Sequence, residues 1–186
     1  MQIPDESIDL IFTDPPYLKE YLHLYDWLAI ESQRILKPDG FLLAYTPSYW
    51  KAKIIIEACK HLDYYTDIVV LTKGPASVIW ASKTLAKAKF IIAYRKKGSK
   101  SKQRVMVHNV YSGDGPEKDG HEWQQGLGEA IYYIDCFSDI GDVVYDPFMG
   151  SGTTAEASKI LDRNYIGAEI DFVHAENAIN RLEANQ

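Results

Sequence analysis

Short apolar runs alternate along this chain with longer amphipathic stretches, and this alternation constrains the fold more than any other feature. Short runs rich in β-branched and aromatic residues are typical of buried strands, whereas the longer stretches have helical spacing. Strands that alternate with helices form a largely parallel sheet covered by helices on both faces, so we predict a three-layer α/β fold. Near-continuous hydrophobicity predicts that all the strands are interior ones. The predicted strands are residues 8–13, 40–45, 66–72, 89–94, 142–146 and 165–169.

Turn residues mark several ends of the predicted elements. Pro38 and the pair Asp39-Gly40 end the first helix, because proline blocks helix continuation and Asp-Gly tolerates a tight turn. Residues 95–123 lack apolar periodicity and are rich in Gly, Ser, Lys, Asp and Glu, which predicts one long irregular segment. The predicted helices are residues 21–36, 49–62, 126–138, 153–161 and 172–182.

The composition excludes several classes of protein. A chain of 186 residues, 46% of them apolar, suits one domain with a sizeable core. No apolar run is long enough to cross a bilayer, and the first residues lack the features of a secretion signal, so we expect a soluble cytoplasmic protein without a membrane partner. The two cysteines, Cys59 and Cys136, form no CxxC pair and indicate neither a disulfide framework nor a metal site.

One segment is strongly basic, although the chain as a whole has a formal charge of −6. Residues 95–104 contain six Lys or Arg and no acidic residue. A local positive face is enough to bind the phosphates of a nucleic acid, and a solvated loop without a specific partner is the alternative. The candidate DNA-binding residues are Lys96, Lys97, Lys100, Lys102 and Arg104.

A glycine turn follows the fifth predicted strand, in residues 146–154. Gly150 and Gly152 let the backbone pass close to a ligand, and the N–H groups that begin the next helix can bind a polar group. The segment lacks both the third glycine of a dinucleotide fingerprint and the lysine of a P-loop, so neither NAD nor ATP is favoured. Open α/β folds hold ligands where parallel strands end, which is where this turn is expected.

Two acidic residues stand at the end of the sixth predicted strand. Glu169 is well placed to accept hydrogen bonds from both hydroxyls of a ribose beside the glycine turn. Asp171 is better suited to cap the helix that follows, because Asp is a frequent N-cap residue and Glu is not.

The first predicted strand is followed by the tetrad Asp14-Pro15-Pro16-Tyr17. Two prolines remove two backbone donors and fix an extended backbone, so the Asp14 carboxylate and the Pro15 carbonyl present only acceptors beside an aromatic ring. Such a corner suits an exocyclic amino group, which offers two N–H donors on a flat ring that can stack on Tyr17. A loop that merely ends the strand is the structural alternative.

On these residues the chain resembles the amino-group DNA methyltransferases, which use S-adenosylmethionine to modify adenine N6 or cytosine N4. The tetrad matches the family's catalytic motif, and residues 146–154 match its cofactor loop nearly letter for letter. Residues 31–40 resemble the helix and turn after the tetrad, and residues 121–125 resemble the segment before the cofactor loop. The order, with the tetrad first, is that of the family's permuted β group.

The resemblance implies that residues 1–186 form a Rossmann-like methyltransferase domain that methylates DNA at specific sites, as restriction-modification enzymes do. It implies that Asp14, Pro15, Pro16 and Tyr17 are catalytic and that no metal takes part. The leading Asp favours adenine N6, with cytosine N4 as the alternative. The implied S-adenosylmethionine-binding residues are Asp146, Pro147, Phe148, Gly150, Ser151, Gly152, Thr153, Glu169 and Gln124.

The resemblance is incomplete at the front of the chain. Family members have a strand before the tetrad strand whose acidic residue contacts the cofactor's adenine, and nothing here matches it. Either the sheet lacks one edge strand or the chain is a shortened product, so a cofactor- or DNA-binding subunit without catalysis is an alternative function. Little sequence remains for target recognition, which leaves a homodimer or a separate specificity subunit as partners besides DNA. RNA or a protein glutamine amide are alternative acceptors.

Overall fold

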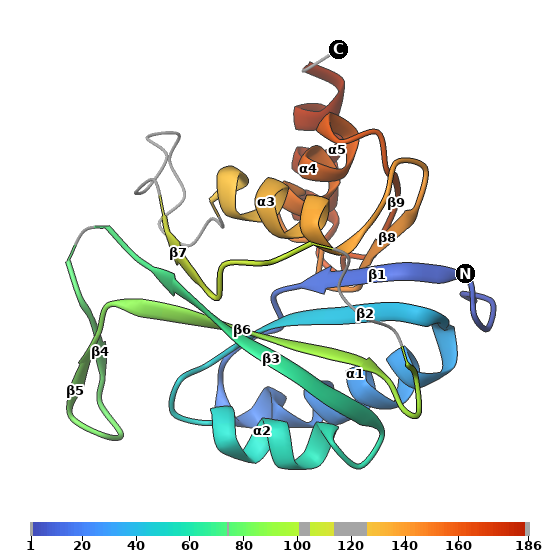
Figure 1. The fold of residues 1–186 in the computed structure, drawn as a ribbon. Helices are drawn as coiled ribbons and strands as arrows, with labels where there is room; N and C mark the ends of the chain where they lie inside the picture. The colour runs from blue at the N-terminus through green and yellow to red at the C-terminus, as the bar shows by residue number, and fades with distance from the viewer. Residues whose placement is uncertain (1, 74, 101–104, 114–125, 185–186) are drawn as a thin grey trace.

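The computed structural model describes residues 2–73, 75–100, 105–113 and 126–184 (Figure 1). Within these ranges, strands of one large sheet alternate with helices, and a small separate hairpin is inserted. The sheet consists of β1 (Ile8–Thr13), β2 (Leu36–Thr46), β3 (Leu62–Leu71), β6 (Ala88–Lys96), β7 (Val110–Ser112), β8 (Val143–Asp146) and β9 (Asn164–Gly167). The hairpin is formed by β4 (Ser77–Ile79) and β5 (Thr84–Ala86). The helices are the 3-10 turn η1 (Lys19–Tyr21) and α1 (Leu22–Ile35), α2 (Lys51–Ala58), α3 (Leu127–Phe137), α4 (Thr153–Ile160) and α5 (Phe172–Ala184).

The sheet is mostly parallel, as predicted, with the strand order β7-β3-β6-β2-β1-β8-β9. β6 is antiparallel to both of its neighbours, β2 and β3, while the other neighbouring pairs are parallel. The carboxyl ends of β1, β2, β3, β8 and β9 therefore meet at one edge of the sheet, which we call the carboxyl edge. The carboxyl end of β6 lies at the opposite edge.

Helices cover both faces of the sheet, which gives the predicted three layers (Figure 1). The alternation of side chains along β2 shows how the two cores are divided. Phe41, Leu43 and Tyr45 belong to the core beneath α3, whereas Leu42 and Ala44 belong to the core that packs on α1 and α2. No helix within the described ranges is both long enough and apolar enough to cross a membrane.

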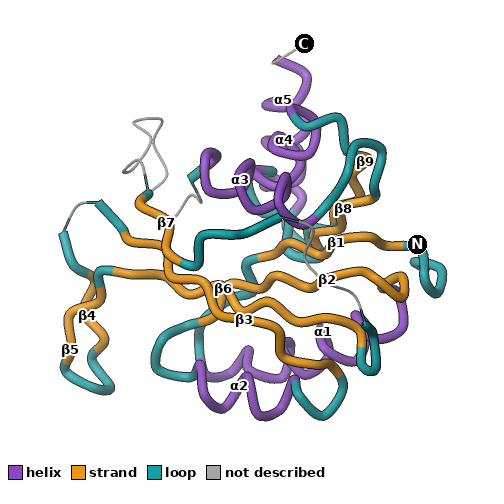
Figure 2. Tube along the Cα trace, in the orientation of Figure 1, coloured by secondary structure: helices purple, strands orange, loops and turns teal. Residues whose placement is uncertain are grey.

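Most predicted elements are present with shifted ends, and the differences have local causes. The prediction that all six strands are interior is wrong for β9, which is an outermost strand of the described sheet and pairs only with β8 there. β2 begins earlier than predicted, at Leu36, because residues 37–40 bulge between the pairs that Ile8 and Leu10 of β1 form with it. Three strands were not predicted, β4, β5 and β7, and each has only three residues, too few for a periodic pattern (Figure 2).

Candidate active site

The fold brings the two sequence motifs together at the carboxyl edge. β1 and β8 are adjacent parallel strands, so Asp14 follows one strand where Asp146 ends the next. The Thr13 hydroxyl donates a hydrogen bond of 2.6 Å to Oδ1 of Asp146, although the residues are 133 positions apart. We call residues 14–17 the acceptor loop and residues 146–153 the donor loop.

The acceptor loop presents oxygen atoms beside an accessible ring. Pro15 is buried, while Tyr17 is 40% exposed. The hydroxyl end of Tyr17 is nevertheless enclosed, and burial, the Asp14 charge and a hydrogen bond with Asp14 raise the pKa of Tyr17. The Tyr25 hydroxyl of α1 lies 3.2 Å from the carbonyl oxygen of Tyr45 and 3.4 Å from that of Pro15. This contact ties the backbone of the acceptor loop to the end of β2.

A cluster of two buried residues, Tyr45 and Glu129, and the half-buried Lys89 lies behind the acceptor loop. Glu129 of α3 is only 4% exposed, and its Oε1 accepts a hydrogen bond of 2.5 Å from the Tyr45 hydroxyl. Lys89 Nζ lies 3.9 Å from the same oxygen. Burial raises the pKa of Glu129, Lys89 and Tyr45 oppose this, and the nearby charge of Asp14 adds to it. The negative groups Asp14 and Glu129 are therefore close enough to interact.

Hydrophobic periodicity does not predict this cluster. A glutamate three residues after Gly126 fits a helix start, and burial of its carboxylate depends on the contact with Tyr45, 84 positions away. The sequence holds one weak signal, which is the acidic Glu129 among the apolar residues of the predicted helix 126–138. Acidic residues are rarely buried on the packed face of a helix.

The donor loop is fixed by the buried carboxylate of Asp146. Besides the Thr13 hydroxyl, Oδ1 of Asp146 accepts a 3.0 Å hydrogen bond from the backbone N–H of Phe148. Burial raises the pKa of Asp146 to about 6, while hydrogen bonds from Thr13, Thr154 and Phe148 act in the opposite direction. The Asp146 carboxylate therefore shapes the loop from within and is not exposed to a ligand.

Glycine is required where the donor loop enters α4, which begins at Thr153 as predicted. Gly152 has φ of +81°, and a Cβ there would lie 3.0 Å from Cβ of Ala178 on α5. A side chain would therefore suffer both backbone strain and a close contact. The close approach of α5 explains the second glycine of the turn.

Glu169 lies beside this turn and binds its backbone. Oε2 of Glu169 accepts a 2.8 Å hydrogen bond from the N–H of Gly150, and Oε1 accepts one of 2.9 Å from the N–H of Asp171. A carboxylate has about four acceptor positions, so two remain for hydroxyl groups of a ligand. Asp171 caps α5, as predicted, through hydrogen bonds to the N–H groups of Val173 at 2.8 Å and His174 at 3.2 Å.

The surroundings of the donor loop fit a ligand with a hydroxylated sugar and an apolar ring. The ring of Phe148 meets Trp27 of α1 edge to face, with centroids 6.1 Å apart. At the end of β9, a Cβ on Gly167 would lie 2.8 Å from Sδ of Met149 and still closer to the Tyr165 hydroxyl. Because Gly167 has no side chain, Met149 of the loop and Tyr165 can occupy this space. The Glu169 carboxylate and aromatic surface therefore lie beside one turn.

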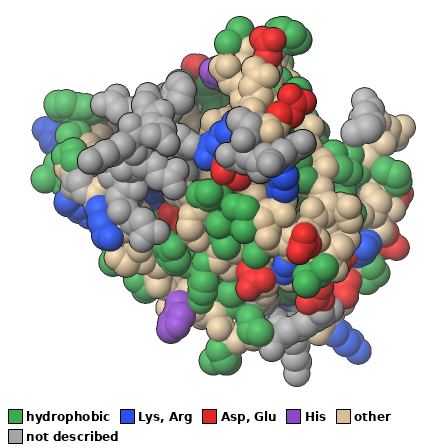
Figure 3. All heavy atoms as spheres, turned by 90° about the horizontal axis from the view of Figure 1, so that it is seen from above, with side chains coloured by type: hydrophobic (Ala, Val, Ile, Leu, Met, Phe, Trp, Pro, Cys, Tyr) green, Lys and Arg blue, Asp and Glu red, His purple; other side chains and the backbone are tan. Residues whose placement is uncertain are grey.

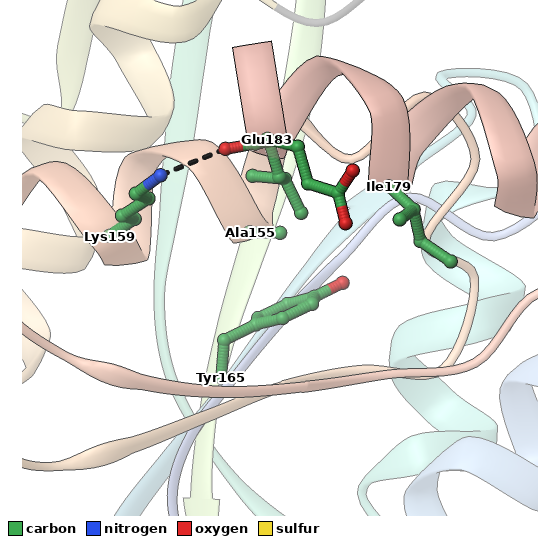
Figure 4. A pocket seen from close by; sticks show the side chains of 6 residues that line it. Ala155, Lys159, Tyr165, Ile179 and Glu183 are labelled. Carbon is green, nitrogen blue, oxygen red and sulfur yellow. Dashed lines mark hydrogen bonds between the residues drawn. The ribbon is translucent and has the colours of Figure 1, made fainter. Parts of the chain in front are cut away.

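A separate pocket of about 310 Å³ lies between α4, α5 and β9 (Figure 4). Lys159 closes one side by donating a 2.8 Å hydrogen bond to the Leu182 carbonyl. None of the predicted site residues lines this pocket, so we assign the site to the two loops instead. The lining residues are Ala155, Lys159, Tyr165, Ile179, Leu182 and Glu183.

The structure does not bring the basic segment to the two loops. Because β6 is antiparallel, Lys96 lies at the edge opposite Asp14, where its Nζ is 2.7 Å from Oε1 of Glu6. Lys97 Nζ donates a 2.9 Å hydrogen bond to the carbonyl of Lys60, and Lys100 follows in the same segment. The remaining predicted contacts, Lys102 and Arg104 for DNA and Gln124 for the cofactor, lie outside the described residues.

Known proteins resemble the chain over nearly its whole length. The model of the DNA methylase family, of the N6/N4 type, matches residues 8–180. The type II methyltransferase M.BamHI of Bacillus amyloliquefaciens is 28% identical over 91% of this chain and 51% of its own length. M.HinfI of Haemophilus influenzae is 28% identical over 97% of this chain and 64% of its own length. The chain therefore spans about half to two thirds of the length of these two relatives.

Two further similarities concern an adenine methyltransferase and solved structures. The DNA adenine methyltransferase YhdJ of Escherichia coli is 28% identical over 98% of this chain and 78% of its own length. The crystal structure of M1.HpyAVI with S-adenosylmethionine (SAM) superposes with a TM-score of 0.77 at 27% identity, covering 95% of this chain and 90% of that one. The cytosine-N4-specific PvuII methyltransferase has a TM-score of 0.82 at 19% identity, over 96% and 80% of the two chains, and shows the shared fold. Motifs, fold and family match agree: the chain belongs to the N6/N4 DNA methylase family.

Proposed function

We propose that this chain, as one domain spanning residues 1–186, transfers a methyl group from S-adenosylmethionine to the exocyclic N6 of adenine in DNA. The observation that carries the proposal is the pairing of β1 with β8, which sets the acceptor loop beside the donor loop. The 2.6 Å hydrogen bond between Thr13 and Asp146 holds the two loops in register. A methyl donor and an amino acceptor held by the two loops would meet at the carboxyl edge.

The donor loop supplies a site that fits S-adenosylmethionine. Glu169 would accept hydrogen bonds from the ribose hydroxyls with the two acceptor positions that Gly150 and Asp171 leave unused. When bound, S-adenosylmethionine supplies a methyl group on a positively charged sulfur. The complex of M1.HpyAVI, which is 27% identical, supports this assignment.

The acceptor loop would orient the amino nitrogen. The lone pair of an aromatic amine is delocalised into the ring, so the nitrogen is a weak nucleophile. The Asp14 carboxylate and the Pro15 carbonyl would accept its two hydrogens and favour a pyramidal nitrogen aimed at the methyl group. Tyr17 would stack on a base rotated out of the duplex, and its exposed ring surface allows this. While one oxygen of Asp14 accepts a hydrogen of the amino group, the other oxygen can keep its hydrogen bond with the Tyr17 hydroxyl.

The proton that leaves the methylated nitrogen needs a nearby negative group. Asp14 is the nearest candidate, because it would already hold one of the amino hydrogens. Glu129 lies close enough for its charge to interact with Asp14, and Lys89 and Tyr45 keep it in place. In the transition state, positive charge moves from the methyl donor to the acceptor nitrogen. The negative charge of Glu129 would favour that state.

Adenine is the proposed base for two reasons. The tetrad begins with Asp, as is common among adenine-modifying members of the family, and the similar YhdJ is named a DNA adenine methyltransferase. Cytosine N4 presents the same two hydrogens and is the alternative product.

The test is direct identification of the product. Unmethylated DNA is incubated with the purified chain and S-adenosylmethionine, digested to nucleosides and analysed by mass spectrometry. N6-methyladenine is the expected product. N4-methylcytosine would move the assignment to the other base. Cofactor binding by calorimetry without either product would instead indicate a subunit without catalysis.

A further inference from the structure

The β4–β5 hairpin is a basic arm that stands apart from the sheet (Figures 1 and 2). Residues 72–87, which contain it, include three lysines and no acidic residue, although the chain carries a net charge of −6. The hairpin is closed at its base by a 2.9 Å hydrogen bond from the Thr72 N–H to the Lys87 carbonyl. Lys73 and Lys83 are exposed. In Figure 3, hydrophobic and basic side chains lie at the end of the molecule where Figure 1 places the hairpin.

Apolar side chains of the hairpin face solvent instead of a core. Val78 and Leu85 form a cross-strand pair, and they are 49% and 72% exposed. Trp80, in the turn, is 82% exposed. A two-stranded hairpin is marginally stable alone, and an exposed tryptophan beside two aliphatic residues is typical of a contact surface. The arm therefore combines an apolar tip with lysines, a pattern suited to a polyanion that has apolar surface between its charges.

The register of the sheet places the arm near the acceptor loop. Thr13 of β1 is level with Ala44 of β2, which is level with Ile92 of β6. Ile92 is in turn level with Asp67 of β3. β3 then runs four residues further, to Leu71. Leu71 is therefore about 13 Å beyond Thr13 along the strand direction and three strand spacings, about 14 Å, from it across the sheet. The arm thus begins about 19 Å from Thr13, at the same edge, which corresponds to about six base pairs of duplex.

We propose that the β4–β5 hairpin binds the DNA duplex that flanks the target base, with Trp80 against the bases and Lys73 and Lys83 on phosphates. This inference rests on the proposed function and names the part of the chain that holds its substrate. Charge complementarity favours DNA over a second copy of this chain, because duplex DNA carries a negative charge about every 1.7 Å along its axis. The arm also lies on the edge where the substrate must arrive. Apolar side chains that enter a groove between basic contacts are a known mode of DNA binding.

The experiment compares two DNA lengths. Binding of a duplex of about 30 base pairs with a central target is measured by fluorescence anisotropy at several salt concentrations. Trp80→Ala should weaken this binding about tenfold. The double variant Lys73→Glu/Lys83→Glu should weaken it further and lower the slope of log K against log salt by about two. A duplex of about eight base pairs, too short to reach the arm, should bind equally to wild type and variants.

Matched controls lie on α2 and directly after it. Ile56→Ala removes another exposed apolar side chain, and Lys60→Glu reverses an exposed lysine. Neither variant should change binding of either duplex. Affinity for S-adenosylmethionine should be the same in all variants.

If wild type methylates DNA and the arm variants bind the long duplex as tightly as wild type, the inference is overturned while the proposed function stands. If wild type binds the long duplex through the arm but yields no methylated base, the proposed function fails alone. A wild-type dimer that Trp80→Ala converts to monomers would overturn the inference in favour of self-association.

Discussion

The two loops of the site lie at the ends of adjacent strands, yet they are built in opposite ways. The acceptor loop uses two prolines, which remove backbone donors, so side-chain and carbonyl oxygens are what it offers. The donor loop uses glycines, whose N–H groups donate within the chain to Glu169 and Met149, and its own carboxylate, Asp146, is buried. In the proposed function, a cationic methyl donor and an N–H-bearing acceptor would thus meet two different surfaces. The difference predicts that substitutions in one loop affect transfer and those in the other affect binding.

The largest expected effect is the loss of transfer in the acceptor loop. Asp14→Ala removes the carboxylate that would hold the amino group, and kcat should fall by about 10³-fold. Affinity for S-adenosylmethionine, measured by calorimetry, should change by less than about twofold. Asp14→Asn is the matched variant, because it keeps the size of the side chain and should still lose activity. Full transfer activity in either variant would contradict the assignment of Asp14.

The second effect concerns stability and pH, and it comes from the buried carboxylate of the donor loop. Burial raises the pKa of Asp146 from 3.8 to about 6, so between these pH values the folded chain binds more protons than the unfolded one. The free energy of unfolding should therefore fall as pH rises from about 4 to about 6, by at most about 3 kcal/mol from this group. Asp146→Asn does not titrate and should lack this contribution. Urea unfolding at pH 4.5 and pH 7 measures it, and identical pH dependence in the two proteins would argue against a raised pKa.

The smallest effect should be confined to cofactor binding. Glu169→Gln replaces one acceptor oxygen with an amide, which conflicts with the N–H of Gly150 or Asp171 and weakens contacts with ribose hydroxyls. The dissociation constant of S-adenosylmethionine should rise about tenfold, while kcat at saturating cofactor should stay within about threefold. Glu183→Gln, in the separate pocket, is the control and should change neither value. A fall in kcat without a change in affinity for S-adenosylmethionine would contradict the expectation that the donor loop affects binding and the acceptor loop affects transfer.

Much of this arrangement could be predicted because its signals are local. β1 has the predicted bounds, since Asp14-Pro15 ends the strand unambiguously. Parallel strands that alternate with helices also bring both motifs to one edge without knowledge of any side-chain contact. The capping role of Asp171 followed from its place before a helix.

Other features depended on information that hydrophobic periodicity does not contain. A strand pattern gives no direction, so the antiparallel β6, which carries Lys96 away from Asp14, could not be foreseen. The hairpin strands are too short to produce a pattern, and the hairpin's lysines are more widely spaced than the basic residues at 95–104. The cluster of Tyr45, Lys89 and Glu129 requires three elements to pack together, which only the tertiary structure defines.

The hydrogen bond between Thr13 and Asp146 has a consequence for how the chain is made. Its two ends are 133 positions apart, which at about 5–20 residues per second separates their synthesis by roughly 7–27 s. During that interval β1 has its neighbour β2 on one side, while the side meant for β8 is an unpaired edge to which another strand can add. An interior strand of the finished sheet is thus a temporary edge of the growing one. Only when β8 has been made does this edge gain its partner, and only then is the donor loop complete.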